Sequence, residues 1–304
     1  MFPDAVRYVA ARRRARSAAC AGALLIGCVL TTGTVAAQQA TPRTELRVCA
    51  DPYSLPTSNQ EMAGYENKIA ALFGEKLGIP VTYTWFPQRI GFIRNTLTNN
   101  ETEDGSYKCD LVMGVIENFE LAATTRPYLR SAWAMVYVKG RGLDFIKSQD
   151  DLANLTPEQK AMMRIGVWDR GAATDFVYQN DLMEQAVPFQ SMSGDKQESP
   201  GKIIERDLVQ DKINLTFVWG PIAGYYAKQI EDHEIVVIPM QSRPGLRFDF
   251  QITMAVRFPD KAWKDEVNRL IEENQEEINA ILADYGVPLL ELQLRAPEAD
   301  DDDD

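Results

Sequence analysis

The fold is decided by residues 44–52, which read TELRVCADP. Apolar residues alternate with polar ones, and the run ends on the turn pair Asp51-Pro52, so the stretch predicts a short strand. Residues 64–78 follow with apolar side chains at helical spacing and a closing glycine, which predicts a helix. A strand that leads directly into a helix is the first half of a β-α-β unit, which indicates an α/β fold with parallel strands.

The alternation of strands and helices continues along the chain. We predict strands at 81–86, 110–115 and 132–138, with a helix at 91–97. Glycines and charges at 139–142 then suit a crossing into a second lobe. Further strands are predicted at 164–168, 215–219, 235–239 and 251–256, with a helix starting at 172–179 and a long amphipathic helix at 260–285.

This order predicts two α/β lobes joined by a hinge with two crossings. The first lobe takes residues 44–139 and 251–290, the second lobe takes 140–250, and 291–304 form an acidic C-terminal tail. Asp300 to Asp304 repel one another too strongly to pack, so we expect a solvated tail. Attraction of that tail to a basic protein or a hard cation stays open.

The N-terminus carries a targeting signal. Five Arg precede an uncharged, Ala- and Leu-rich stretch at 17–37, an order typical of a secretory signal peptide, and the small residues Val35 and Ala37 place the cut after Ala37. Signal peptide 1–37 is the prediction; a lipoprotein acylated at Cys28 and a retained anchor are the alternatives. Ser, Thr and Gly dilute the apolar stretch, so no stable membrane span is expected.

Composition and charge narrow the function classes. The chain has 304 residues, 45% of them hydrophobic, enough for a sizeable core, and a net charge of -12. Removal of residues 1–37 takes away five Arg and one Asp, which leaves 27 basic and 43 acidic side chains and a net charge of -16. A chain this acidic is repelled by phosphate backbones, so nucleic-acid binding is not expected.

Cys49 and Cys109 are the two cysteines left after residue 37, in a compartment that permits disulfides. Against a bridge, Cys49 lies late in its predicted strand and Cys109 starts another. If the two strands are parallel neighbours, an offset of four residues at about 3.3 Å each exceeds bridging distance. The disulfide between them therefore stays open.

Enzyme chemistry has little support. The only histidine, His233, lies in the acidic, surface-like run EDHE, and with two cysteines no nucleophile-base pair and no N/S metal site has its ligands. Glu66, Glu117 and Glu120 stay open as acids, but their spacing singles out no catalytic pair. We expect a protein that is not an enzyme, with no metal and no cofactor.

Seven segments, in order, resemble periplasmic solute-binding proteins that share their fold with polar amino-acid receptors. They are 46–52, 64–70, 84–89, 92–97, 109–115, 124–128 and 218–226. The more specific resemblance is to the MxaJ/XoxJ family, whose members are encoded beside quinoprotein methanol dehydrogenases, and it covers residues 44–290. It implies a periplasmic binding protein type 2 fold and a location in the periplasm. XoxJ, associated with the lanthanide-dependent enzyme, is favoured, although the motifs do not separate the two.

Amino-acid recognition is not expected, because a closed cleft must neutralise both the carboxylate and the ammonium of its ligand. In the receptors that the chain resembles, an Arg after the third strand holds the carboxylate, and here Leu121 stands at that position. A carboxylate of the second lobe holds the ammonium, and here Trp219 takes its place. An indole offers one N–H donor and no negative charge.

Candidate cleft residues come from the strand ends, the aromatic residues around the cleft and the expected N-terminus of a ligand-facing helix. They are Asp51, Gly114, Val115, Arg126, Trp168, Arg170, Thr174, Trp219 and Tyr225. Arg126 offers an anion contact, and free N–H groups at a helix start can hold an anion. Plain core packing of the aromatic residues and a surface ion pair for Arg126 are the alternatives.

A second candidate surface concentrates aromatic and Arg residues, the types enriched at binding hot spots. Its residues are Trp85, Gln88, Arg89 and Arg94. We interpret them as a patch that faces a partner protein, against the alternative of a structural turn with solvent contacts.

The predicted function follows from the resemblance. The chain is expected to be a periplasmic accessory protein that binds a quinoprotein methanol dehydrogenase, of the lanthanide type, and assists its assembly or activation. Its cytochrome c is an open further partner, and so is a small ligand in the cleft. The alternative is the substrate-binding protein of an ABC transporter for a small solute other than an amino acid.

Overall fold

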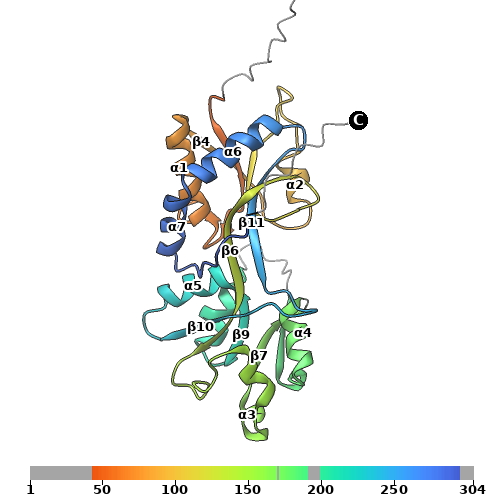
Figure 1. Ribbon diagram of the computed structural model, residues 1–304, viewed down its shortest axis with the longest axis vertical. Helices are drawn as coiled ribbons and strands as arrows, with labels where there is room; N and C mark the ends of the chain where they lie inside the picture. The colour runs from red at the N-terminus through yellow and green to blue at the C-terminus, as the bar shows by residue number, and fades with distance from the viewer. Residues whose placement is uncertain (1–42, 170, 191–198, 295–304) are drawn as a thin grey trace, which may run out of the picture. The chain divides into compact units, whose positions relative to one another are not determined.

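A computed structural model describes residues 43–169, 171–190 and 199–294 (Figure 1). The predicted signal peptide, Arg170 and residues 295–304 of the acidic tail lie outside the described residues. Within the described ranges, no helix has the length and apolarity needed to cross a bilayer.

The first lobe is built on one sheet with the strand order β4-β1-β5-β11-β6. β1 (Leu46–Ala50) pairs in parallel with β4 (Val81–Trp85) and β5 (Leu111–Ile116), while β11 (Asp249–Val256) is antiparallel to β5 and to β6 (Ala123–Val138). Around it lie α1 (Tyr65–Leu77), α2 (Phe92–Asn95), α6 (Lys261–Glu273) and α7 (Gln275–Asp284), and the short hairpin β2 (Tyr53–Ser54) and β3 (Ser58–Asn59). The predicted parallel β-α-β start is confirmed.

The second lobe has its own sheet, in the order β10-β6-β9-β7-β8. β7 (Ile165–Trp168) is parallel to β8 (Ala186–Phe189) and β9 (Leu215–Trp219), and β10 (Ile235–Pro239) is antiparallel to β6. Its helices are α3 (Pro157–Met162), α4 (Ala172–Gln179) and α5 (Gly220–Gln229), with 3-10 turns at Gln149–Asn154 and Met183–Gln185 and a π-helix at Ile203–Leu208. Strand β8 is an element that the sequence pattern did not predict.

Strand β6 belongs to both sheets, and this creates the first crossing (Figure 1). Its first part pairs with β11, and residues 133–138 pair with β9 and β10. The second crossing, by which the chain returns to the first lobe, lies near Trp133. The N–H of Trp133 donates to the carbonyl of Phe248 (2.9 Å), and its carbonyl accepts from the N–H of Met240 (2.8 Å). The hinge with two crossings is therefore confirmed, and the lobe boundaries stay a prediction.

Two differences from the predicted elements have clear causes. The strand predicted at 132–138 begins at Ala123, because the residues before it pair with β11. The helix predicted at 260–285 is broken at Asn274, whose backbone leaves the helical region and whose side chain amide donates to the carbonyl of Leu270 (2.7 Å). That local hydrogen bond competes with the helix ladder and ends α6.

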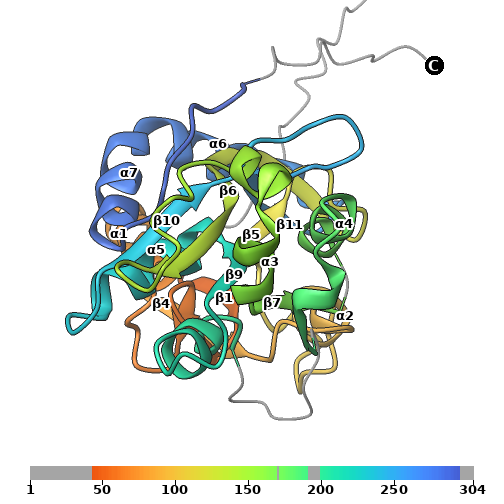
Figure 2. The same ribbon diagram turned by 90° about the horizontal axis from the view of Figure 1, so that it is seen from below.

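In the described part of the chain, four apolar clusters stabilise the two sheets, two for each lobe. In the first lobe, Phe73 of α1 and Leu270 of α6 pack with β1, β5 and β11, and Phe92 of α2 packs with residues on the other face. In the second lobe, Phe176 and Ala223 each belong to one cluster. Figure 2 shows α1 and α7 side by side, in agreement with their packing in one cluster.

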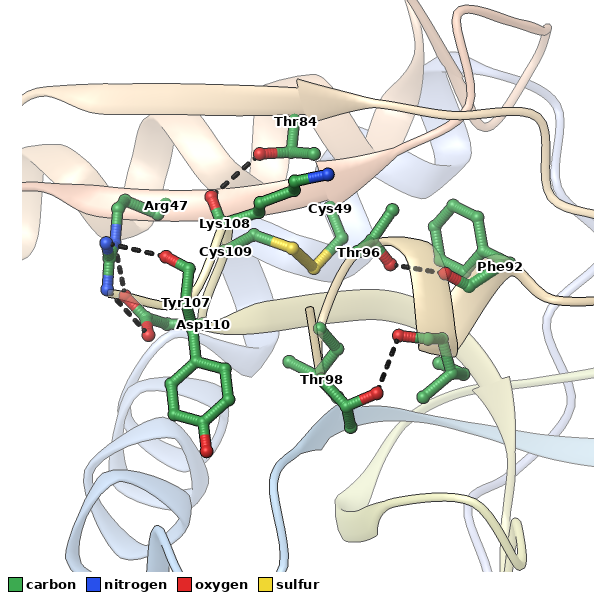
Figure 3. The surroundings of a disulfide bond; sticks show 12 residues. Arg47, Cys49, Thr84, Phe92, Thr96, Thr98, Tyr107, Lys108, Cys109 and Asp110 are labelled. Carbon is green, nitrogen blue, oxygen red and sulfur yellow. Dashed lines mark hydrogen bonds and ion pairs between the residues drawn. A yellow bond between two sulfur atoms is a disulfide. The ribbon is translucent and has the colours of Figure 1, made fainter. Parts of the chain in front are cut away.

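Cys49 and Cys109 form a disulfide, with their Cα atoms 5.5 Å apart (Figure 3). The objection from the strand offset does not apply, because Cys109 is not in line with β5, which starts at Leu111. The chain bends over β1 first: the Lys108 carbonyl accepts from Thr84 Oγ1 (2.7 Å), and Thr84 is the register partner of Cys49. This bend brings the two sulfur atoms together.

Asp110, next to the disulfide, is buried and paired with three Arg. Its carboxylate contacts Arg43, Arg47 and Arg257 at 2.9, 2.7 and 2.5 Å. Burial alone would raise the pKa of Asp110, but the hydrogen bonds from Arg47 and Arg257 and the charge of Arg43 keep it below its ordinary value. Since Arg257 also donates to the Cys109 carbonyl (2.6 Å), this cluster holds the bend in place.

Replacing both cysteines, Cys49→Ser with Cys109→Ser, should lower the free energy of unfolding by about 2–4 kcal/mol. The bridge closes a loop over a sequence separation of 60, and its loss frees the unfolded chain. Urea unfolding of the oxidised protein and the double variant measures the difference. The reduced wild-type protein is the control and should match the variant; equal stability of all three proteins would contradict the disulfide's role.

Candidate functional site

The candidate site is a cavity of about 650 Å³ in the first lobe. Its apolar walls come from Ile90, Phe92, Ile93, Val115, Ile116, Phe119 and Leu121, and its polar rim from Gln88, Arg89 and Arg94, with Gly91 and Gly114 between them. A volume of this size with mainly apolar walls and a few polar groups is typical of ligand and peptide sites.

Two chain segments form the cavity. One is the turn at 88–91 with α2, and the other is the end of β5 with the loop toward β6. Both follow the carboxyl ends of parallel strands, where open α/β sheets bind their ligands. Asp51 fastens the first segment, because its carboxylate accepts from the N–H of Gln88 (2.6 Å) and of Tyr53 (2.8 Å).

The cavity leaves large apolar side chains in contact with solvent. Ile90 is 85% exposed, Leu121 60% and Ile116 50%. Burying one such side chain is worth about 1.5–3 kcal/mol, and grouped exposed apolar residues mark surfaces that bind a partner or ligand. The wall therefore offers binding energy to an apolar occupant.

Gly114 lies between this cavity and a buried acid. Its φ is +54°, and a Cβ at this position would lie 2.3 Å from Oε1 of Glu66, so both conformation and space require glycine. Glu66 is 8% exposed, and its burial raises the pKa of its carboxyl group to about 8, with the negative charge of Asp51 adding to the effect. The acid is held close to neutral directly beneath the cavity wall.

The structure brings together residues that the sequence assigned to two different surfaces. Gly114 and Val115, predicted for the cleft, and Gln88, Arg89 and Arg94, predicted for the partner surface, all line the one cavity. The amide of Gln88 donates to the Gly114 carbonyl (3.4 Å), which joins the two segments. Trp85 does not line it and instead stacks on Tyr83, with ring centroids 4.8 Å apart.

Arg126, predicted as an anion contact in the cleft, lies on β6 beside α6. Its guanidinium pairs with Glu272 of α6 (2.6 Å), and its backbone N–H donates to Asn268 (2.7 Å), so the side chain lies against α6 and does not line the cavity. The surface ion pair that was the alternative interpretation describes it.

At the start of α4, where an anion site is predicted, two candidate residues contact other parts of the same lobe. Thr174 donates its hydroxyl hydrogen to the Trp168 carbonyl (2.6 Å), and the ring of Trp168 packs against Phe189 with centroids 5.9 Å apart. Thr174 and Trp168 thus close the turn between β7 and α4, and neither lines the cavity. The third candidate of this turn, Arg170, lies outside the described residues.

Trp219 and Tyr225 pack elsewhere than in the cavity. Trp219 ends β9 opposite Trp133 and meets Phe250 edge-on, with centroids 6.1 Å apart. Tyr225 on α5 stacks on Tyr285, with centroids 6.0 Å apart. Both ring contacts agree with plain packing, the alternative interpretation, and a ligand contact of either side chain stays a prediction.

Ile90, Ile116 and Phe119 are cavity residues that sequence reasoning missed. Their signal was weak: Ile116 is the last residue of β5, and Ile90 and Phe119 are apolar side chains in connecting segments, where polar residues are expected. Leu121 was noted only as the replacement for a receptor Arg, and it stands on the cavity wall. Among the described residues, no group of three or more His, Cys, Asp and Glu side chains is placed to hold a metal ion.

Comparison with known proteins identifies similar chains. No family model matches. The periplasmic binding protein XoxJ from Methylobacterium extorquens AM1 has 31% sequence identity and a TM-score of 0.64, over 81% of this chain and 99% of that structure. MxaJ from Methlophaga aminisulfidivorans MPT has 25% identity and a TM-score of 0.66, over 81% and 100%. Protein MoxJ of Methylorubrum extorquens is 26% identical over 81% of each chain.

Glu66→Gln should raise stability at pH 8 by a few kcal/mol and flatten its pH dependence. Because the folded-state pKa is raised to about 8 from an ordinary 4.5, the folded protein binds more protons than the unfolded chain in that window, and stability falls as pH rises through it. Each pKa unit corresponds to about 1.4 kcal/mol. Urea unfolding at pH 5 and pH 8 measures both effects.

The matched control is Glu75→Gln, an exposed acid on the same helix, which should keep the wild-type pH dependence. A wild-type protein that is as stable at pH 8 as at pH 5, or a Glu66→Gln variant with the wild-type profile, would rule out a buried acid of raised pKa.

Proposed function

The chain belongs to the MxaJ/XoxJ family of periplasmic binding proteins, and on that premise we propose that it binds a quinoprotein methanol dehydrogenase in the periplasm and assists its assembly or activation. The higher identity to XoxJ than to MxaJ supports the lanthanide-dependent enzyme as the partner. The cytochrome c of the same oxidation system is proposed as a further partner.

The observation that carries this proposal is the apolar cavity with its exposed rim. A receptor for a polar solute needs charged groups that replace the water of its ligand. This cavity has apolar walls, and Ile90, Ile116 and Leu121 reach into solvent around it. Such a surface is complementary to an apolar segment of another protein, which would bury the three side chains on docking.

The charges of the rim support a partner that is not basic. Arg89 and Arg94 line the cavity, and among the described residues that line it there is no Asp or Glu. The chain as a whole is strongly acidic, so the rim is a local exception to its negative field. An apolar segment flanked by acidic residues would meet favourable charges here and repulsion over most of the remaining surface.

The disulfide supports the proposed location. Structural disulfides persist in oxidising compartments such as the bacterial periplasm, and Cys49 and Cys109 are bridged. The relative named XoxJ is described as a periplasmic binding protein. Export through signal peptide 1–37, which lies outside the described residues, is part of the proposal.

Leu121→Glu should weaken binding to the dehydrogenase about tenfold or more, because it removes an apolar contact and places a charge that loses its water on docking. Phe258→Glu is the matched control: Phe258 is 61% exposed, like Leu121, but does not line the cavity. Both variants should keep the wild-type melting temperature. Binding is measured by biolayer interferometry with the purified dehydrogenase and by its activity after assembly with each variant.

Equal loss of binding in both variants would remove the cavity as the docking site. Full activation of the dehydrogenase in cells that lack this chain would remove the accessory function altogether. The transporter alternative would be favoured instead if a small metabolite stabilised the protein and the dehydrogenase did not bind.

Amino acids should leave the protein's thermal stability unchanged. A ligand at 100 times its dissociation constant stabilises a protein by about 2.7 kcal/mol, which differential scanning fluorimetry detects readily. Leu121 and Trp219 stand where the receptors carry their charged pair, so a zwitterion finds no counter-charges there. Stabilisation by any polar amino acid would contradict this account of the cleft.

A further inference from the structure

The C-terminal segment from Tyr285 to Leu294, here called the strap, leaves α7 of the first lobe and touches the second lobe and both hinge strands. We propose that the strap is a latch: it holds the two lobes in one arrangement, and its release lets the lobes move and loosens the cavity wall. The effect on the cavity rests on the proposed function of that cavity; the latch itself does not.

The strap meets α5 of the second lobe at the closest approach that backbones allow. A Cβ at Gly224 would lie 1.8 Å from the carbonyl oxygen of Gly286, and one at Gly220 would lie 2.8 Å from Pro288. Gly220 and Gly224 are four residues apart, so they share one face of α5. Glycine inside a helix costs about 1 kcal/mol relative to alanine, and this contact is the physical reason for accepting that cost.

Side chains extend the same contact. Tyr225 of α5 stacks on Tyr285, which in turn meets Tyr65 of α1 edge-on, with centroids 5.9 Å apart, and donates its hydroxyl hydrogen to the Ala63 carbonyl. Lys228 donates to the carbonyl of Asp284 (2.6 Å). In Figure 1, α5 lies next to the end of α7, in agreement with these contacts. A helix of the second lobe is thereby fastened to the first lobe.

The strap then binds the crossing strand β6. Ser131 donates its hydroxyl hydrogen to the Pro288 carbonyl (2.6 Å), and the N–H of Leu290 donates to the Arg130 carbonyl (2.8 Å). Arg130 donates to the carbonyl of Glu291 (2.9 Å) and also pairs with Asp249 at the second crossing (2.7 Å). Both crossings are thus tied to the strap at the place where a hinge would turn.

The end of the strap reaches the cavity wall through Gln251 of β11. The Gln251 side chain exchanges two hydrogen bonds with the backbone of Gln293 (2.7 and 3.0 Å) and donates to the carboxylate of Glu117 (3.2 Å). Glu117 follows Ile116 directly and starts the loop that carries Phe119 and Leu121. Moving the strap therefore removes a support of that loop.

Rotation of the lobes about the two crossings would move α5 relative to α7 and must break the Gly224–Gly286 and Tyr225–Tyr285 contacts. A latch differs from a passive linker in that its contacts form in one arrangement only, and we expect this of both contacts. The wild-type protein should accordingly populate a single interlobe distance.

The test measures the distance between nitroxide labels on p-acetylphenylalanine placed at Lys68 of α1 and Glu158 of α3, both exposed. Double electron–electron resonance should give one narrow distribution for the wild-type protein. Gly224→Ala and, separately, Tyr225→Ala should add a second population or broaden it. Tyr178→Ala is the matched control, since Tyr178 is 71% exposed on α4, and it should leave the distribution unchanged.

Hydrogen exchange gives a second readout of the strap. Gln251→Ala, which removes the side chain that bonds the Gln293 backbone and Glu117, should speed exchange at Leu290 and at the loop 116–122 about tenfold. Tenfold corresponds to about 1.4 kcal/mol of lost opening free energy. This variant lies outside the contact between α5 and the strap, so it tests the latch if Gly224→Ala fails to fold.

Several outcomes would overturn the latch: a broad distribution in the wild-type protein, unchanged distributions in both Gly224→Ala and Tyr225→Ala, or a higher melting temperature in Gly224→Ala, as helix propensity alone would give. No dehydrogenase is present in these measurements. The latch can therefore be ruled out while the proposed function stands, and the proposed function can be ruled out while the latch stands.

Discussion

Everything in this structure depends on β6, a strand of 16 residues that belongs to two sheets. Because each buried backbone group needs a hydrogen-bond partner, the edge that β6 shows in the first lobe has to be covered. The Asn268 side chain accepts from the N–H of residue 126, and the Gln275 side chain donates to the carbonyl of residue 128. The N–H of Leu290 donates to the carbonyl of residue 130. The unpaired backbone groups at this edge of β6 thus fix the positions of α6, α7 and the strap.

The same constraint explains where the cavity lies and what it can hold. β5 and the loop after it lie on the other side of β11, next to α2 and the turn before it, and Ile116 and Leu121 stay exposed to solvent there. In a receptor for a zwitterion this position would carry charged groups, and here it carries Leu121 with Ile90 and Ile116. A site with an Arg selects a charged ligand, whereas a site with apolar side chains instead binds a partner that buries apolar surface.

Two buried acids of the first lobe have pKa values shifted in opposite directions, Asp110 downward and Glu66 upward. Asp110 is buried but meets three Arg, and it stays ionised as part of the framework around the disulfide. Glu66 is buried against Gly114 without such a cation, so the pKa of its carboxyl group rises to about 8. Glu66 lies against β5 at Gly114, and the strap supports the loop after β5 through Gln251 and Glu117. Ionisation of Glu66 and movement of the strap are therefore two independent ways to change this strand and its loop.

The order of apolar and polar residues determined the α/β alternation, the two lobes and their crossings, because strand and helix periods are local properties. With the family resemblance, it also led to the prediction that the charged pair of an amino-acid receptor is missing at Leu121 and Trp219. Only the tertiary structure decided which candidates meet: Gln88 and Gly114 are joined in one cavity, Arg126 turns to Glu272, and Tyr225 stacks on Tyr285. The disulfide between Cys49 and Cys109 also depends on the tertiary structure, because the chain bends before Leu111 and the order of strands in the sequence does not predict that bend. Contacts between residues far apart in the chain depend on how the strands bend and pack, and local patterns do not carry that information.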